Sequence, residues 1–243
     1  MSIAALMLTF ALVSCATSNS SSAENKPAAV VEQPPRGGVA KAEDQKPLAP
    51  IPFFMRHNLD ESGKGIGAQF KDEQKWVISE FTNKGRVWME GDAVFIERGN
   101  DMTGITWKGP ICRTNYEITL EAKRAEGGDF FCGLTFPYGN DPCSLILGGW
   151  GGSVCGISSL DYYDAYNNET CTFEDFKQDQ WYKVKLRVSP TKIEAWIDDR
   201  QIIDVKTEKK KIGIRWEVEP SVPLGIATWQ TTGAIRNIEF KAF

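Results

Sequence analysis

The chain has 243 residues, a net charge of −4, a hydrophobic content of 42% and a charged content of 25%. These values are typical of a globular protein of one domain with tails. No nucleic acid is expected as a partner, because phosphate binding needs clustered Lys and Arg and the single basic run is Lys209–Lys211. The single histidine, His57, excludes metal sites built from several histidines.

Residues 1–14 are predicted to be a signal peptide. An apolar run at 3–13, too short to cross a bilayer as a helix, ends in Leu12-Val13-Ser14-Cys15, which resembles the lipobox of bacterial lipoproteins. The resemblance implies cleavage before Cys15 and lipidation of that residue. The protein would then be lipid-anchored in the bacterial cell envelope, on the periplasmic or outer-membrane side. An ordinary secretory signal is the alternative.

Residues 15–52 are predicted to be a disordered tether. The segment from Ala16 to Pro52 has no aromatic residue and holds half of the 12 prolines, with many Ser, Ala, Glu and Lys. Such a segment cannot bury enough apolar surface to offset its ordering entropy. The folded domain is therefore expected over 53–243, with the membrane reached only through the lipid anchor.

From Lys75 onward, short segments alternate between apolar and polar residues. In chain order the expected strands are 116–123, 130–136, 144–149, 153–158, 181–188, 193–197, 202–205 and 235–243. Only Phe173–Lys177 shows a hint of helical periodicity. Many short strands with one polar face predict an all-β fold, an antiparallel two-sheet β-sandwich, and a jelly roll would hide the edges of its sheets.

Five cysteines follow Cys15: Cys112, Cys132, Cys143, Cys155 and Cys171. An odd number leaves at least one of them unpaired within the chain. Their proximity in the sequence predicts disulfides Cys132–Cys143 and Cys155–Cys171, and buried free thiols are the alternative.

Several segments resemble known sandwich families. The run Trp181–Val188 followed by Ile193–Asp199 resembles laminin-G and concanavalin-like sandwiches. Four segments, at 129–137, 148–152, 156–161 and 223–229, resemble a bacterial family, the 3-keto-disaccharide hydrolase domain. The resemblance covers roughly residues 88–243. It implies a concanavalin-like jelly roll and hydrolysis of 3-keto-disaccharides or related glycosides.

A candidate sugar site lies in the stretch from Gly148 to Thr170. The sequence Gly148-Gly-Trp-Gly-Gly152 joins two expected strands, so Trp150 is either a core residue or a platform on which a sugar stacks. The loop that follows mixes tyrosines, acids and amides, as sugar sites do, although a polar surface loop has the same composition. The predicted substrate-binding residues are Trp150, Tyr163, Asn167, Arg215 and Trp229.

Catalysis would use carboxylates. A ketone at C3 acidifies the C2 proton, so one carboxylate could remove that proton while an acid helps to expel the group at C1, and water would then add. The candidate catalytic residues are Asp161, Asp164, Glu169 and Asp129, and Arg215 could stabilise the enolate-like oxygen.

Two other interpretations remain open. The segment Gly127–Gly133 lacks the Asn-Ser-Gly and Arg that the family usually carries, which favours a non-catalytic, lectin-like module that binds glycan at the cell envelope. No cofactor is predicted, but calcium is an alternative, because Asp161, Asp164, Asn167 and Glu169 supply oxygen ligands close together in the sequence.

Overall fold

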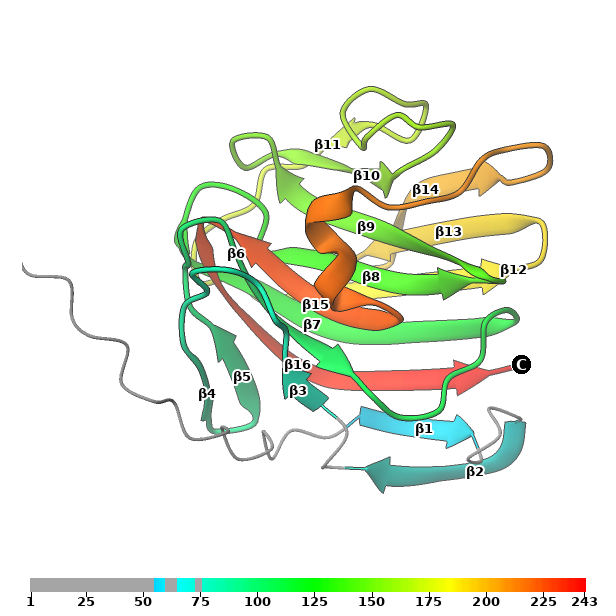
Figure 1. Cartoon of the computed structure of the whole chain (residues 1–243), viewed down its shortest axis with the longest axis horizontal. Coiled ribbons are helices and arrows are strands. Elements are labelled where there is room, and N and C mark those ends of the chain that lie inside the picture. The colour runs from blue at the N-terminus through cyan, green and yellow to red at the C-terminus, as the bar shows by residue number, and fades with distance from the viewer. Residues whose placement is uncertain (1–54, 60–64, 73–75) are drawn as a thin grey trace, which may run out of the picture. The chain divides into compact units, whose positions relative to one another are not determined.

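Two β-sheets pack against each other in the computed structural model (Figure 1), which describes residues 55–59, 65–72 and 76–243, with side chains from residue 76 onward. The predicted signal peptide, Cys15 and the predicted tether lie outside the described residues. None of the described helices is long and apolar enough to cross a membrane.

The larger sheet has nine strands within the described residues. Its main path is β14 (Arg200–Lys206), β13 (Lys192–Ile197), β12 (Tyr182–Ser189), β7 (Tyr116–Gly127), β16 (Thr231–Ala242), β1 (Met55–Leu59) and β2 (Gly65–Asp72). Beside this path, β5 (Ala93–Ile96) pairs with β16 and with β4 (Val87–Glu90). Every pair is antiparallel except β1 with β16, which is parallel.

The smaller sheet has seven strands within the described residues. Their order is β11 (Thr172–Phe173), β10 (Val154–Ser158), β9 (Asp141–Gly149), β8 (Cys132–Tyr138), β15 (Leu224–Trp229), β6 (Met102–Trp107) and β3 (Trp76–Ile78). A 3₁₀ helix, η1 (Trp216–Ser221), lies over this sheet in Figure 1 and contacts β15 and β6. The predicted all-β fold, an antiparallel two-sheet β-sandwich, is confirmed.

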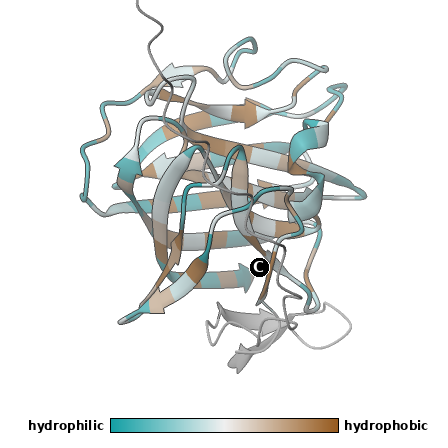
Figure 2. Cartoon of the chain, turned by 60° about the vertical axis from the view of Figure 1, so that its left-hand side comes forward, coloured by the Kyte–Doolittle hydropathy of each residue, from teal (hydrophilic) through white to brown (hydrophobic). Residues whose placement is uncertain are grey.

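Alternation of polar and apolar residues places the core between the sheets. Every second side chain is buried from Tyr116 to Ala122 along β7 and from Tyr182 to Val188 along β12, as the sequence predicts. Figure 2 shows the same change of hydropathy along the strands. One cluster joins side chains from both sheets, including Trp107, Phe136 and Phe240. Burial of each such side chain contributes about 1.5–3 kcal/mol.

The predicted disulfides are wrong, because all five cysteines are free thiols. Cys132 faces Leu147 across the β8–β9 pair, whereas Cys143 faces Phe136, which is four residues further along the strand. Cys155 pairs with Thr172, and Cys171 precedes that residue, so its side chain points to the other face of the strand. The alternative interpretation, buried thiols, holds for Cys132, Cys143 and Cys155.

The hint of a helix at Phe173–Lys177 is also wrong. Thr172 and Phe173 form β11, and the residues from Glu174 to Lys177 have no regular structure. Phe176 is buried against Phe131 and Tyr182, so tertiary packing fixes the segment instead.

Burial should protect three of the thiols in the folded chain. It raises the pKa of Cys132, Cys143 and Cys155 to about 12, so their reactive thiolate forms are scarce at neutral pH. Brief treatment with iodoacetamide, followed by peptide mass spectrometry, should leave these three unmodified, and unfolding in urea should expose them. Rapid labelling of any of the three in the native chain would contradict their placement in the core.

Candidate functional site

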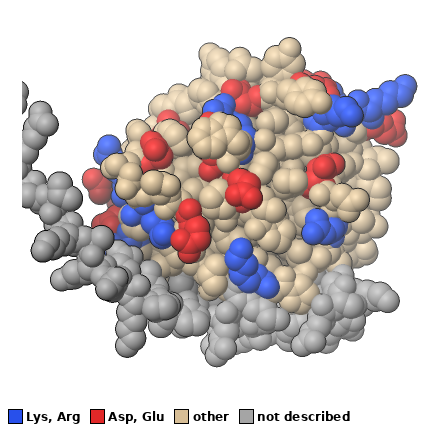
Figure 3. All heavy atoms as spheres, viewed as in Figure 1, with Lys and Arg blue, Asp and Glu red and all other residues tan. Residues whose placement is uncertain are grey.

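A cleft of about 220 Å³ lies on the outer face of the seven-stranded sheet, beside η1. Figure 3 shows that the corresponding face of the molecule is largely uncharged, with acidic and basic side chains scattered over it. The residues that line the cleft are Met102, Asp129, Phe130, Ser144, Ile146, Trp150, Ser158, Arg215, Glu217, Val218 and Trp229.

Small side chains occupy much of this outer face. The pleat of β8 and β9 directs Leu134 and Leu145 into the core, and it leaves Gly133, Thr135 and Ser144 on the opposite side. The Thr135 and Ser144 hydroxyl oxygens lie 2.9 Å apart and share a hydrogen bond. Because these side chains are short, a ligand can approach closely to the backbone of the sheet.

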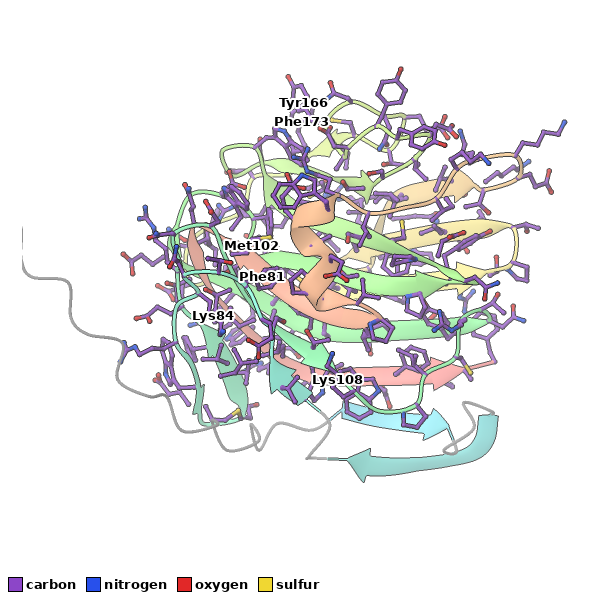
Figure 4. All side chains as sticks on the ribbon, viewed as in Figure 1. Phe81, Lys84, Met102, Lys108, Tyr166 and Phe173 are labelled. Atoms are coloured by element: carbon purple, nitrogen blue, oxygen red, sulfur yellow. The ribbon has the colours of Figure 1, made fainter. Side chains whose placement is uncertain are left out.

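One wall of the cleft is apolar. Phe81, Met102, Val218 and Ala227 form a small buried cluster against which Phe130 and Trp229 pack. Figure 4 shows Phe81 and Met102 close to η1. The ring centroids of Phe130 and Trp229 are 6.4 Å apart. This wall offers aromatic and aliphatic surface that could cover the apolar face of a sugar ring.

A glycine-rich loop presents Trp150 at the cleft. Trp150 itself has φ 50°, and Gly151 and Gly152 have φ values of 87° and 115°, a region that glycine adopts without the strain of a Cβ atom. The Trp150 side chain is outside the core and 41% exposed. The interpretation of Trp150 as a core residue is therefore wrong, and its role as a platform stays a prediction.

Arg124 and Asp129 fix this loop. The buried Arg124 guanidinium donates from Nη2 to the carbonyl oxygens of Gly148, at 3.2 Å, and Gly152, at 2.7 Å. Burial lowers the pKa of Arg124, and the charge of Asp129 partly offsets this effect. Asp129 Oδ2 accepts a hydrogen bond from the Gly151 N–H at 3.0 Å, and Oδ1 accepts one from the Phe130 N–H at 2.7 Å. Asp129 therefore lines the cleft with both oxygens engaged by backbone groups.

Arg215, Glu217 and Asp164 form an ion cluster at the cleft. Arg215 Nη2 donates to Glu217 Oε1 at 2.5 Å, and Nη1 donates to Asp164 Oδ2 at 3.4 Å. Partial burial raises the pKa of Glu217. The hydrogen bond from Arg215, a hydrogen bond from the backbone of Glu217 and the positive charge of Arg215 together lower it by more, so the net pKa is below the usual value. Glu217 is thus a carboxylate at neutral pH.

Two buried side-chain polar atoms of the cleft residues have no hydrogen-bond partner within the part of the chain that is described: Glu217 Oε2 and Ser158 Oγ. Both atoms are buried, and Ser158 as a whole is only 2% exposed. Buried polar atoms are nearly always satisfied in folded proteins, and an exception calls for an explanation such as a catalytic role, an ordered water or a bound ion. The residues around the cleft therefore carry one acceptor and one hydroxyl group that no described group satisfies.

The acidic loop at 161–170 lies outside the lining of the cleft, apart from its contact through Asp164. Asp161 and Glu169 both form ion pairs with Lys210, at 3.5 Å and 3.1 Å. Asp161 Oδ1 also accepts a hydrogen bond from the Lys211 N–H. These two predicted catalytic side chains therefore hold the loop to the segment before η1.

The two predicted binding residues in this loop also lie outside the cleft lining. Asn167 donates from Nδ2 to Asp164 Oδ1 at 2.9 Å, and Tyr163 is 60% exposed. No group of three or more His, Cys, Asp or Glu side chains that could hold a metal occurs among the described residues. Carboxylate oxygens of the three acids considered for calcium, Asp161, Asp164 and Glu169, contact lysine, arginine or backbone N–H groups instead.

The structure gathers four predicted site residues in the cleft: Asp129, Trp150, Arg215 and Trp229. Sequence reasoning missed Glu217 and Ser158. The one local signal for Glu217 was its position two residues after Arg215, a cation that was predicted to bind the ligand. Ser158 offered none, because a serine at the end of a strand is common.

Known proteins of solved structure resemble this chain only weakly in sequence. A search of curated proteins finds no match. Among solved structures, a carbohydrate-binding module of family 66 from Bacillus subtilis is 11% identical with a TM-score of 0.43, covering 69% of this chain and 96% of its own. A glycosyl hydrolase family 16 protein from Mycobacterium smegmatis is 10% identical with a TM-score of 0.43, covering 74% and 97%. At these values the similarities carry no argument about activity.

The family comparison is more specific. The family model described as the 3-keto-alpha-glucoside-1,2-lyase-like domain matches residues 67–241, well over half of the chain. The matched range includes every residue that lines the cleft. The chain therefore belongs to the 3-keto-alpha-glucoside-1,2-lyase-like family.

Proposed function

We propose that the chain binds carbohydrate in the cleft beside η1 and cleaves 3-keto-α-glucosides there. The observation that carries the proposal is the arrangement of Glu217, whose Oε1 is fixed by Arg215 while Oε2 is buried with no hydrogen-bond partner among the described residues. A carboxylate held in this way can act as a base towards a ligand in the cleft. Membership of the 3-keto-alpha-glucoside-1,2-lyase-like family indicates which ligand to try.

The reaction would begin at C2 of the oxidised sugar. Glu217 Oε2 is covered in the ligand-free chain, so the side chain would first turn this oxygen towards the cleft. It then takes the C2 proton, which the C3 ketone acidifies, and the C–H electron pair forms an enolate with its charge on the C3 oxygen. The ketone then re-forms, a C1=C2 double bond is made and the C1–O1 bond breaks. O1 leaves with the bonding pair and is protonated by water. Addition of water across C1=C2 would complete a net hydrolysis.

Arg215 would stabilise the enolate. Its guanidinium is held by Asp164 on one side and Glu217 on the other, at 3.4 and 2.5 Å, so its orientation is set before the substrate arrives. A positive charge fixed beside a developing oxyanion lowers the barrier without reorganising in the transition state. Trp150, Phe130 and Trp229 would cover the apolar face of the sugar.

The first experiment is to incubate the chain with 3-keto-maltose, with and without a chelator. We expect release of glucose, an ultraviolet absorbance from the conjugated enone, and deuterium at C2 of recovered substrate in D₂O. Loss of glucose release in the presence of the chelator would support the calcium interpretation. Failure to exchange the C2 proton or release glucose would contradict lyase chemistry.

A lectin-like binding module is the second candidate. Asp129 accepts hydrogen bonds from backbone N–H groups, and Asp164 is bound to a backbone N–H group and to Arg215. Among the described residues, Glu217 is therefore the cleft carboxylate with an unpartnered oxygen. One hydrogen-bond acceptor beside aromatic surfaces suffices for binding. Saturable binding of 3-keto-maltose without exchange or release would favour this module. Its attachment to the cell envelope through Cys15 remains a proposal in either case.

A further inference from the structure

Three exposed aromatic rings form a row that starts at the cleft and leads away from it. Trp150, Tyr166 and Phe173 are 41%, 49% and 63% exposed. The ring centroids of Trp150 and Tyr166 are 6.2 Å apart, and those of Tyr166 and Phe173 are 6.5 Å apart. Figure 4 shows Tyr166 and Phe173 together at the end of the sheet that carries β10 and β11. Trp150 belongs to both the row and the cleft lining.

Each ring is presented by a constrained backbone. The Trp150 loop is fixed by Arg124 and Asp129, as described above. The Tyr166 N–H donates to Asp164 Oδ1 at 3.1 Å, and the preceding Ala165 is fully buried. Phe173 lies on β11, where it pairs with Val154. Exposed aromatic surface held in a fixed arrangement, with polar groups around it, is typical of a binding site.

We infer that this row binds the glycan chain attached to O1 of the sugar in the cleft, so that the preferred leaving group is an oligosaccharide. The inference rests on the proposed function, because it takes the oxidised sugar to lie beside Glu217. A ligand that continues from the cleft meets Trp150 first and then Tyr166 and Phe173.

The changing orientation of the rings favours a glycan over a flat aromatic aglycone. The planes of Trp150 and Tyr166 differ by 26°, whereas those of Tyr166 and Phe173 differ by 89°. A rigid planar group cannot lie face-on against two perpendicular rings. Successive pyranose rings rotate about the glycosidic bond and can follow such a turn, and each offers an apolar C–H face for stacking.

Polar groups beside the rings suit the hydroxyl groups of such a chain. The exposed Asn167 directly follows Tyr166, and Glu169 is 56% exposed and paired with Lys210. Amide and carboxylate groups accept hydrogen bonds from hydroxyl groups, and amide and ammonium groups donate them. The acidic loop would therefore contact the leaving glycan and not the reacting carbon.

The test compares 3-keto-maltose with 3-keto-maltotetraose on the full chain, using kcat/KM for glucosyl cleavage and calorimetry for binding. We expect kcat/KM to be about tenfold higher for the longer sugar, mostly through a lower KM, because stacking remote from the reacting carbon stabilises ground and transition states alike. Phe173→Ala and Tyr166→Ala should remove this advantage and leave the value for 3-keto-maltose unchanged.

Tyr162→Ala is the matched control, because Tyr162 lies in the same loop and is 86% exposed but is outside the row. It should keep the full advantage of the longer sugar. Equal kcat/KM and equal affinity for the two sugars in the unaltered chain would overturn the inference. If neither sugar is cleaved, the proposed lyase function fails, and the calorimetric comparison still decides the row: tighter binding of the tetrasaccharide supports it, and equal or absent binding overturns it.

Discussion

Glu217→Gln should lower the turnover of 3-keto-maltose by roughly 10²–10⁴-fold, the usual contribution of a positioned general base. The amide keeps the shape of the side chain and can still accept a hydrogen bond from Arg215, but it cannot take the C2 proton. Binding of 3-keto-maltose, measured by calorimetry, should therefore change little. The same variant should no longer exchange deuterium at C2.

Glu219→Gln is the control for this change, because Glu219 lies on the same 3₁₀ helix and its side chain is exposed. It should cleave 3-keto-maltose at the original rate. Full activity in Glu217→Gln would remove Glu217 from the mechanism and return attention to Asp164. Loss of binding together with turnover would indicate a structural or binding role for Glu217.

The pH profile provides a second readout of the same residue. Because the net pKa of Glu217 is lowered, its base form persists at neutral pH and is lost only as the pH falls through that lowered value. We expect kcat/KM to be flat around neutrality and to fall in acid, below the pH at which an ordinary glutamate titrates. The acid limb should be absent in Glu217→Gln.

Gly225→Ala should unfold more easily and lose most of its activity. A Cβ atom at Gly225 would lie 2.6 Å from the carbonyl oxygen of Ser221 and 2.8 Å from its Cα, both backbone atoms that cannot move aside cheaply. Overpacking of this kind costs about 1–3 kcal/mol. Ser221 ends η1, so the helix that carries Glu217 must shift.

Urea unfolding and cleavage of 3-keto-maltose measure the two effects of Gly225→Ala. Gly128→Ala is a suitable control, because an added Cβ there meets no atom within 4 Å. It should keep the midpoint and the activity of the unaltered chain. An unchanged midpoint in Gly225→Ala would show that η1 is not held against β15 as described.

The sheets could be predicted from the sequence because half-buried strands repeat every two residues. Tyr116–Lys123 and Ile193–Ile197 show this period without interruption, and the structure buries the expected face of each. The 3₁₀ helix at Trp216–Ser221 was not predicted, because six residues are too few to leave a periodic signal in the sequence.

The candidate site was only partly predictable. Asp129, Trp150, Arg215 and Trp229 meet because β8 lies between β9 and β15, a neighbour relation that no local pattern encodes. Asp161 and Glu169 were proposed as catalytic residues from the composition of their loop. Acids that bind a sugar and acids that pair with Lys210 are the same residue types, so composition could not separate the two roles.

The position of β16 determines when the domain can fold. This strand, the last of those described, pairs with β7 on one side and with β5 and β1 on the other. Strands made early, from Met55 onward, thus lack a central partner until the segment Thr231–Ala242 has been synthesised. Pairings so distant in sequence make folding slow and leave apolar strand faces exposed meanwhile. The nine-stranded sheet must form after synthesis of the domain is nearly complete, so a growing chain needs protection from aggregation until then.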